Sequence, residues 1–216
     1  MINFLIGVLS SLVATWAGLA AAFLWSGRFR WFLVTALSRL SGGDFGQSWS
    51  NKAEAEADIS REFRRARRVD LFTGRGNELQ RATFDTLLAD STGPGTHPKF
   101  RILLPCTGTG ESARWTRDRE SEIASFDRSF GTGQLHRQIE TNVAHVAPYN
   151  REGTVETRRY NFPHLGRICI TDRAAYFTPY LPHEHGRDSK VLKYAASSPM
   201  YHALNRLFEK LWDGSV

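Results

Sequence analysis

The sequence predicts a mixed α/β domain that follows a single membrane-spanning helix. Three observations support this fold class. The chain has no charged residue before Arg28, although its mean hydropathy is −0.37. Beyond residue 52, short β-branched and aromatic runs alternate with segments of helical periodicity. A Gly- and Ser-rich stretch between these parts is typical of a linker. We therefore expect a membrane helix with a juxtamembrane extension (1–40), a linker (41–52) and a domain (53–216).

The apolar run Phe4–Trp25 is close in length to the roughly 20 residues that cross a bilayer core as a helix. A cleaved signal peptide would have a basic n-region and a shorter apolar core of about 7–15 residues, and nothing basic precedes Phe4. A buried core helix is rarely apolar on every side over this length. Arginines follow the run and none precedes it, so the positive-inside rule places the N-terminus outside the cell membrane and the domain in the cytoplasm.

Small residues recur at four-residue spacing within this run. Such residues let membrane helices approach closely, so the spacing predicts a packing face through which the chain forms a homo-oligomer. The alternative is that membrane helices are rich in Gly and Ala for other reasons, and the sequence leaves the two interpretations open. The residues of this face are Gly7, Ser11, Ala14, Gly18 and Ala22.

The chain has a formal net charge of +6, and all charged side chains lie beyond residue 27. Such a domain at a membrane surface is expected to attract anionic lipid, nucleic acid or a phosphate-bearing ligand. Cys106 and Cys169 lie in or beside apolar runs, which favours reduced and inert thiols. The spacing of metal ligands is also present in His183, His185 and Asp188. Because these residues lie in a polar loop, we expect their side chains to be solvated. We predict neither a metal nor a cofactor.

Helical and strand-like segments alternate along the domain. An apolar stripe, Ile59, Phe63 and Ala66, predicts a first helix, and Asn77 with Gln80 suits the N-terminus of a second. A later helix begins with Ser198 as N-cap and Pro199 at its first position. Its expected buried face comprises Leu204, Leu207, Phe208, Leu211 and Trp212. The expected strands are 69–73, 100–105, 154–161, 167–171, 174–181 and 190–195.

This order of elements resembles one half of the phospholipase D fold, and is most similar to bacterial single-copy domains of that superfamily with a decayed catalytic motif. The family motif is His-x-Lys-x4-Asp. Arg167 matches the lysine and Asp172 the aspartate, but Leu165 occupies the position of the nucleophilic histidine. Leucine cannot be a nucleophile. If Leu165 faces the site, strand alternation turns His164 to the opposite face. The resemblance therefore implies a degenerate site without catalytic residues.

The remnant site is still expected to bind an anion. The superfamily places phosphate near strand ends, where Arg158, Arg167 and Lys190 are expected beside Asp172, and arginine grips phosphate without reacting. The backbone of Gly74, Arg75 and Gly76 at a helix start is a second candidate anion site. The alternative for each arginine is a solvated surface charge or a salt bridge.

These observations lead to three candidate functions. The first is a single-pass protein of the bacterial inner membrane whose domain senses a nucleotide, nucleic acid or protein partner and acts through its membrane helix. The resemblance implies that such a protein serves as an effector in antiphage defence. The second is an active membrane-bound phosphodiesterase, a nuclease or phospholipase, that uses His164 in a shifted register and is completed by dimerisation. The third is a membrane tether for a cytoplasmic partner.

Overall fold

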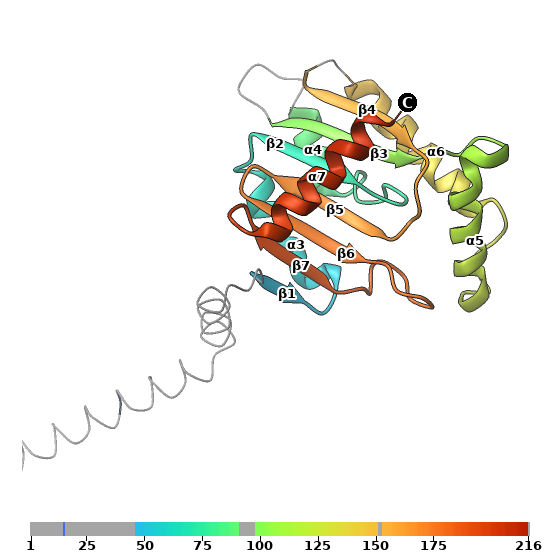
Figure 1. The fold of residues 1–216 in the computed structure, drawn as a ribbon, viewed down its shortest axis with the longest axis horizontal. Coiled ribbons are helices and arrows are strands. Elements are labelled where there is room, and N and C mark those ends of the chain that lie inside the picture. The colour runs from blue at the N-terminus through green and yellow to red at the C-terminus, as the bar shows by residue number, and fades with distance from the viewer. Residues whose placement is uncertain (1–14, 16–45, 91–97, 151–152, 216) are drawn as a thin grey trace, which may run out of the picture. The chain divides into compact units, whose positions relative to one another are not determined.

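The described strands form one mixed sheet in the order β1-β7-β6-β5-β2-β3-β4 in the computed structural model (Figure 1). The structure describes residues 15, 46–90, 98–150 and 153–215. Strands β2, β3 and β4 are parallel, whereas β5, β6 and β7 join through antiparallel pairs. The mixed α/β class predicted from the sequence is confirmed. The strands are β1 (Gln47–Trp49), β2 (Arg68–Phe72), β3 (Lys99–Pro105), β4 (Val155–Tyr160), β5 (Gly166–Thr171), β6 (Ala174–Pro179) and β7 (Val191–Ala195).

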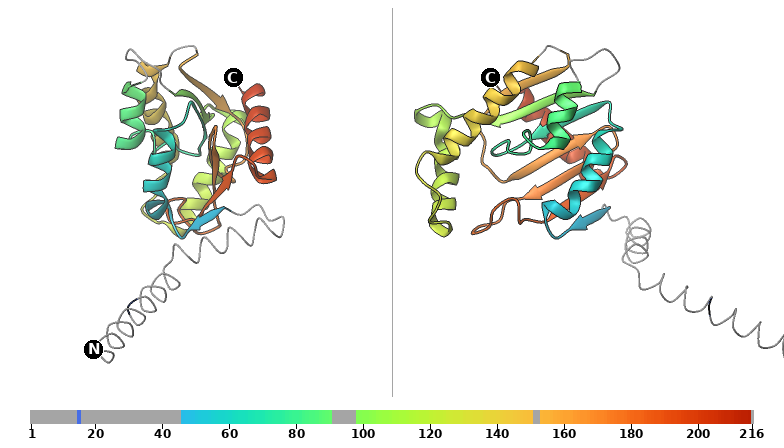
Figure 2. Two further views of the ribbon diagram at one scale, coloured as in Figure 1. Left: turned by 90° about the vertical axis from the view of Figure 1, so that its left-hand side faces the viewer. Right: turned by 180° about the vertical axis from the view of Figure 1, so that it is seen from behind.

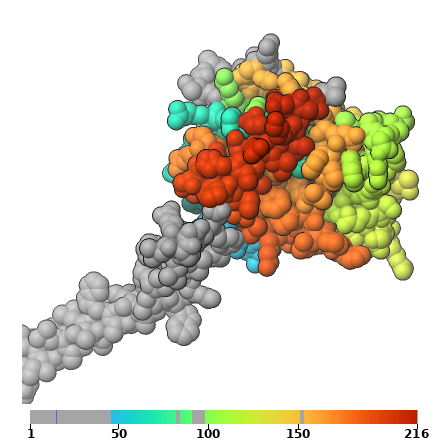
Figure 3. All heavy atoms as spheres, in the orientation of Figure 1, coloured from blue at the N-terminus to red at the C-terminus, as the bar shows by residue number. Residues whose placement is uncertain are grey.

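Helices cover both faces of this sheet (Figure 2). One face carries α3 (Lys52–Phe63), α4 (Ala82–Asp90) and α6 (Gln134–Val146), and α5 (Arg114–Phe126) lies beside α6. The other face carries α7 (Pro199–Asp213), which crosses the surface seen in Figure 3. Two short 3-10 helices, Gly110–Ala113 and Ala147–Tyr149, flank α5 and α6 on the chain. Ser48–Val216 forms one compact unit.

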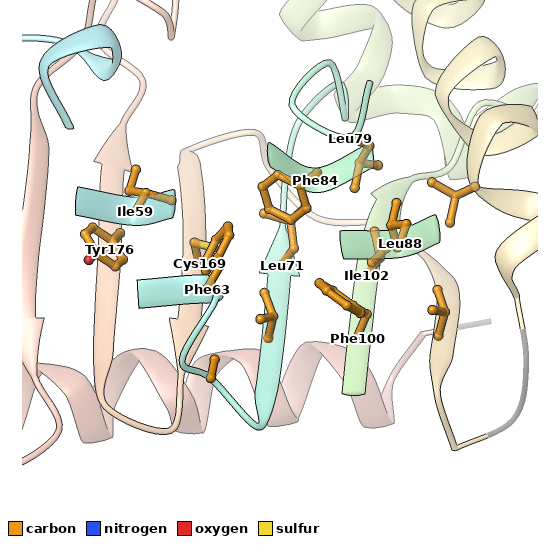
Figure 4. Packing of buried hydrophobic residues seen from close by; sticks show 14 of the residues in the cluster. Ile59, Phe63, Leu71, Leu79, Phe84, Leu88, Phe100, Ile102, Cys169 and Tyr176 are labelled. Atoms are coloured by element: carbon orange, nitrogen blue, oxygen red, sulfur yellow. The ribbon is translucent and has the colours of Figure 1, made fainter. Parts of the chain in front are cut away.

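The main core lies between the sheet and the helices α3 and α4 (Figure 4). Phe63 and Phe84 meet edge to face, with ring centroids 4.8 Å apart. Strand β3 is buried on both faces beyond Arg101, which explains why Ile102–Pro105 is a continuous apolar run rather than an alternating one. This core holds the ends of β2, β5 and β6 in fixed positions, and those ends build the site described below.

Helix α7 begins as predicted. The Ser198 side chain accepts a hydrogen bond from Tyr201 N at 3.1 Å, and Pro199 occupies the first turn. The buried stripe consists of Tyr201, Leu204, Phe208 and Trp212. Leu207 was expected on this stripe but is 37% exposed, because it lies at the flank of the helical face defined by the other four residues.

Two boundaries differ from the sequence-based expectations. Helix α3 ends at Phe63, so Ala66 is buried from the turn that follows. No helix begins at Asn77: α4 begins at Ala82, and the Asn77 side chain instead accepts a hydrogen bond from Asn142 Nδ2 at 2.9 Å. The expected helix start after Gly76 is therefore wrong, whereas anion binding by the backbone of residues 74–76 stays a prediction.

Part of the expected linker is ordered. Gln47–Trp49 forms β1, an edge strand next to β7, and the Trp49 ring stacks on Tyr176 at 6.3 Å between centroids. Asn51 then caps α3 by accepting a hydrogen bond from Glu54 N at 3.1 Å. The aromatic contact and the cap explain why these residues belong to the domain.

Within the described residues, every helix is too short or too polar to cross a membrane. The predicted span Phe4–Trp25 lies outside the described part of the chain, apart from Thr15, as does its whole small-residue face (Gly7, Ser11, Ala14, Gly18 and Ala22). The membrane helix and the oligomer that it would form stay predictions.

Candidate anion-binding site

A cleft of about 470 Å³ opens where β2 and β6 end and β5 begins, beside α5 and α6. The side chains that line the cleft carry a large excess of positive charge. Six cationic side chains line it against two carboxylates, and three of the cations are more than nine-tenths buried. Grouped cations with low-dielectric walls concentrate a positive potential that attracts anions. The cations are Lys52, Arg75, Arg81, Arg119, Arg167 and Arg187, and the carboxylates are Glu78 and Asp127.

Arg167 enters the cleft from the start of β5. Its side chain is buried between neighbouring strands, where Nη2 donates to Thr178 Oγ1 at 3.0 Å. Its Nη1 lies 3.8 Å from Glu78 Oε2. The hydroxyl of Thr178 therefore positions the guanidinium at the wall of the cleft and leaves other N–H groups for a ligand.

Arg75 and Arg119 face the cleft from different segments. Arg75 follows β2, lies over the Phe130 ring at 5.2 Å from its centroid, and forms no ion pair with a carboxylate in the described residues. Arg119 of α5 lies over the Tyr180 ring at 5.3 Å and donates to Glu122 Oε2 at 2.5 Å. The aromatic rings hold both guanidinium planes in place, which lowers the entropy lost when an anion binds.

Glu78 is the buried carboxylate of the cleft. Its Oε2 lies 3.9 Å from Lys52 Nζ, a distance close to that of the Arg167 contact. Burial alone would raise the pKa of Glu78, but the charges of Lys52 and Arg167, with hydrogen bonds from the Thr73 hydroxyl and the backbone, lower it to about 2. Burial also lowers the pKa of Lys52 to about 8. At neutral pH, Glu78 is therefore ionised and Lys52 mostly protonated.

His164 lines the cleft, contrary to the expectation that it faces away. Leu165 N donates to Pro163 O at 2.9 Å, so the chain turns before β5 and strand alternation begins only at Gly166. Leu165 is 62% exposed, whereas His164 is 9% exposed. Burial, with the charges of Arg119 and Arg75, lowers the pKa of His164 to about 4. The imidazole is therefore neutral at physiological pH.

Glycine at position 74 allows two of these side chains to approach. A Cβ at Gly74 would lie 3.0 Å from Tyr180 Cε2 and 3.6 Å from His164 Nδ1. Gly76 has a φ of 81°, and a Cβ there would lie 2.8 Å from Leu104 Cδ2. Gly74 therefore shapes the cleft wall, while Gly76 turns the loop beneath it.

Three of the residues selected from the sequence lie together in the cleft: Gly74, Arg75 and Arg167. The others lie elsewhere in the fold. Arg158 lies on the face covered by α7, where Nη1 donates to Trp212 O at 3.0 Å. Asp172 follows the far end of β5 and accepts a hydrogen bond from Arg67 N at 2.8 Å. Lys190 is exposed and does not line the cleft, and Gly76 lies beneath it. The separation arises because neighbouring strand residues face opposite ways and a strand has two ends.

Several residues of the cleft carry no signal in the local sequence. They come from segments far apart along the chain, and no local motif joins them; they are Lys52, Glu78, Arg119 and Tyr180. The described residues contain no group of three or more His, Cys, Asp or Glu side chains arranged to hold a metal ion. His185, one of the weighed metal ligands, lies on the cleft with Nε2 at 3.1 Å from Asp127 Oδ2.

No protein-family model and no curated protein matches the sequence. Several solved structures are similar, and two of them match at low identity. The first is TrmBL2, an archaeal chromatin protein reported to show a novel mode of DNA binding, with a TM-score of 0.47, 12% identity, and coverage of 97% of this chain and 70% of that one. The second is NucT from Helicobacter pylori, with a TM-score of 0.40, 10% identity, and coverage of 76% of this chain and 91% of NucT. These similarities assign no family.

Proposed function

We propose that this protein binds a phosphate-bearing anion, a nucleotide or a nucleic acid, in the cleft and does not turn it over. The observation that carries this proposal is the excess of buried cations over carboxylates in one concave site. Lys52 and Arg167 share a single carboxylate, Glu78, at 3.9 and 3.8 Å, so an anionic ligand would complete the hydrogen bonds of these buried cations.

Phosphate fits this cleft better than a single carboxylate does. A guanidinium presents paired donors that match phosphate oxygens, and three arginines reach the cleft from β5, α5 and the loop after β2. The cleft volume of about 470 Å³ lies within the roughly 300–1,000 Å³ range of small-molecule sites. A mononucleotide, or one nucleotide of a longer strand, is therefore of suitable size.

The test is equilibrium binding of adenosine 5′-monophosphate and inorganic phosphate to the purified full-length protein. Arg75→Gln should weaken binding by tenfold or more, since a charge-assisted hydrogen bond contributes about 1.5–3 kcal/mol. Arg64→Gln is the matched control, because Arg64 is exposed after α3 and lies outside the cleft. The proposal would be contradicted if neither ligand binds the wild type, or if the wild type, Arg75→Gln and Arg64→Gln bind the ligands with equal affinity.

The position of His164 favours a second candidate, hydrolysis of phosphodiesters. A neutral imidazole has a lone pair that can attack phosphorus while arginines hold the phosphoryl oxygens. The bond to the leaving alkoxide would break as the nitrogen–phosphorus bond forms, and the alkoxide would take a proton from water. A water molecule would then attack phosphorus, releasing the phosphate monoester and restoring the imidazole. His164→Asn should abolish turnover of a generic phosphodiester, nucleic acid or phospholipid if this candidate is right. If the wild-type protein shows no turnover of these substrates, hydrolysis is excluded and the binding function stands.

The wider role rests on the sequence. We propose that the domain is attached to the bacterial inner membrane through Phe4–Trp25 and signals through that helix as an antiphage effector, with a protein or a nucleic acid as its partner. The uncharged run and the arginines that follow it support the topology. Membrane fractionation together with C-terminal reporter fusions tests it: a reporter active only outside the cytoplasm, or a fully soluble full-length chain, would refute it.

A further inference from the structure

Two buried polar atoms of the cleft make no hydrogen bond within the described part of the chain. They are Glu78 Oε1 and His164 Nε2. Both side chains line the cleft, with exposed fractions of 6% for Glu78 and 9% for His164. Buried polar groups in native proteins are nearly always paired, so atoms of this kind in a concave site indicate where a ligand makes contact.

Glu78 requires a donor. An ionised carboxylate accepts hydrogen bonds and cannot donate them. The two nearest cations lie 3.9 Å and 3.8 Å from Oε2, beyond hydrogen-bond distance. The Thr73 hydroxyl and the backbone of Glu78 donate to this carboxylate, but Oε1 has no partner among the described residues. A cationic ligand group at this point would be repelled by the six cationic side chains that line the cleft. A neutral hydroxyl group donates without adding positive charge.

Resting on the proposed function, we infer that the cleft selects a phosphate ester that carries hydroxyl groups, of the kind found in ribonucleotides. A hydroxyl of the ligand donates to Glu78 Oε1, while its phosphate oxygens accept hydrogen bonds from the arginines. A neutral imidazole offers either an N–H or a lone pair at Nε2, so His164 can pair with a phosphate oxygen or with a hydroxyl. Glu78 is thus a specificity-determining residue inside a site that is otherwise built for anions.

The experiment compares two ligands that differ only in their sugar hydroxyls. Adenosine 5′-monophosphate and its 2′,3′-dideoxy form are titrated against the full-length protein, with inorganic phosphate as a third probe. The hydroxylated ligand should bind about tenfold more tightly, which is the effect of one hydrogen bond to a charged acceptor. The comparison uses wild-type protein, so it does not depend on the folding of a variant.

Glu78→Gln tests whether this residue makes the distinction. Glutamine has a similar shape but no charge, and the preference for the hydroxylated ligand should fall to about threefold or less. Glu111→Gln is the matched control, because this exposed side chain pairs with Arg114 at 3.2 Å and lies outside the cleft. If Glu78→Gln fails to fold because Lys52 loses its counter-ion, the double variant Lys52→Met/Glu78→Gln removes the buried pair together.

The outcomes separate the two proposals. Failure of all three probes to bind refutes the proposed function itself. Equal binding of the two nucleotides, or binding of inorganic phosphate alone, overturns only the hydroxyl inference. A preference that persists in Glu78→Gln places the recognition elsewhere and overturns the role of Glu78. A preference that requires Mg²⁺ and disappears with a chelator also overturns it, because a metal would then bridge the ligand to the carboxylate.

Discussion

The two faces of the sheet both bury arginines, but in opposite ways. Beneath α7, Arg101 donates to both oxygens of Asp70 at 2.7 and 2.9 Å and to both oxygens of Glu209 at 2.8 and 2.7 Å. Its guanidinium also lies over the Phe208 ring at 5.1 Å. In the cleft, Arg75 has an aromatic ring beside it but no carboxylate partner among the described residues.

This comparison shows how the role of an arginine depends on its acceptors. A guanidinium whose donors are already used holds two elements together, here β3 and α7. A guanidinium that is held in place but retains free donors is prepared for an external anion. The number of arginines in a segment does not distinguish these cases, whereas the count of acceptors around each one does.

The largest expected effect lies on the α7 face. Asp70→Ala removes a fully buried carboxylate and leaves Arg101 and Arg68 without it, which should lower the free energy of unfolding by about 3–5 kcal/mol. Urea unfolding measures the change, and ligand affinity should stay unchanged while the protein is folded. Asp118→Ala, an exposed change on α5, should stay within about 0.5 kcal/mol. A loss below 1 kcal/mol for Asp70→Ala would contradict the structural role of this network.

The cleft should make stability depend on pH through His164. The pKa of His164 is about 4 in the folded state against 6.5 in the unfolded state. The unfolded state therefore binds more protons between these values, so stability is lost as pH falls from about 6.5 to 4. The expected loss from this residue is roughly 3 kcal/mol. Below pH 4.5, protonation of Glu78 should remove further stability as pH falls towards 2.

His164→Asn checks this pH dependence. Unfolding curves at several pH values should show that the variant loses less stability than the wild type between pH 6.5 and 4. Both proteins retain the other titratable groups, so the difference between the two curves isolates His164. Parallel curves would show that this imidazole is not held neutral by burial.

Arg167→Gln and Arg158→Gln compare the two faces directly. The first should weaken phosphate or nucleotide binding by tenfold or more, because it removes a charge-assisted donor of about 1.5–3 kcal/mol. The second should leave affinity unchanged and lower stability by about 1–2 kcal/mol, since Arg158 lies 4.5 Å over the Trp212 ring. Calorimetric titration and urea unfolding of both variants measure these effects. Loss of binding in Arg158→Gln would place the ligand beneath α7 instead.

The smallest expected effect concerns the N-terminus of α7. Ser198→Ala removes the hydrogen bond to Tyr201 N and should cost about 1 kcal/mol of stability. Ser198→Asp keeps an acceptor at the cap and should restore most of that stability. Ligand affinity should not change in either variant, because the helix lies on the face away from the cleft. A change in affinity would show that the two faces are coupled.

Most strands and helices followed from local sequence, whereas β1 lies in the expected linker. The apolar run of β3, the alternation before Tyr160 and the Ser198–Pro199 start of α7 each arise from interactions between near neighbours, which the sequence displays directly. The expected helix start at Asn77 failed because a distant residue, Asn142, takes its side chain as a hydrogen-bond acceptor. The error thus came from a tertiary contact that overrode a local capping signal.

The sequence by itself determined the mixed α/β class, most element positions, the excess of positive charge and three residues of the cleft. The tertiary structure decided which cationic side chains lie together in the cleft. It brought Lys52, Arg119 and Glu78 to Arg167 from separate elements, turned His164 inward through the bend at Pro163, and placed Arg158 and Asp172 elsewhere. The physical reason is that secondary structure depends on neighbours along the chain, whereas a binding site depends on which strand ends and helices pack together.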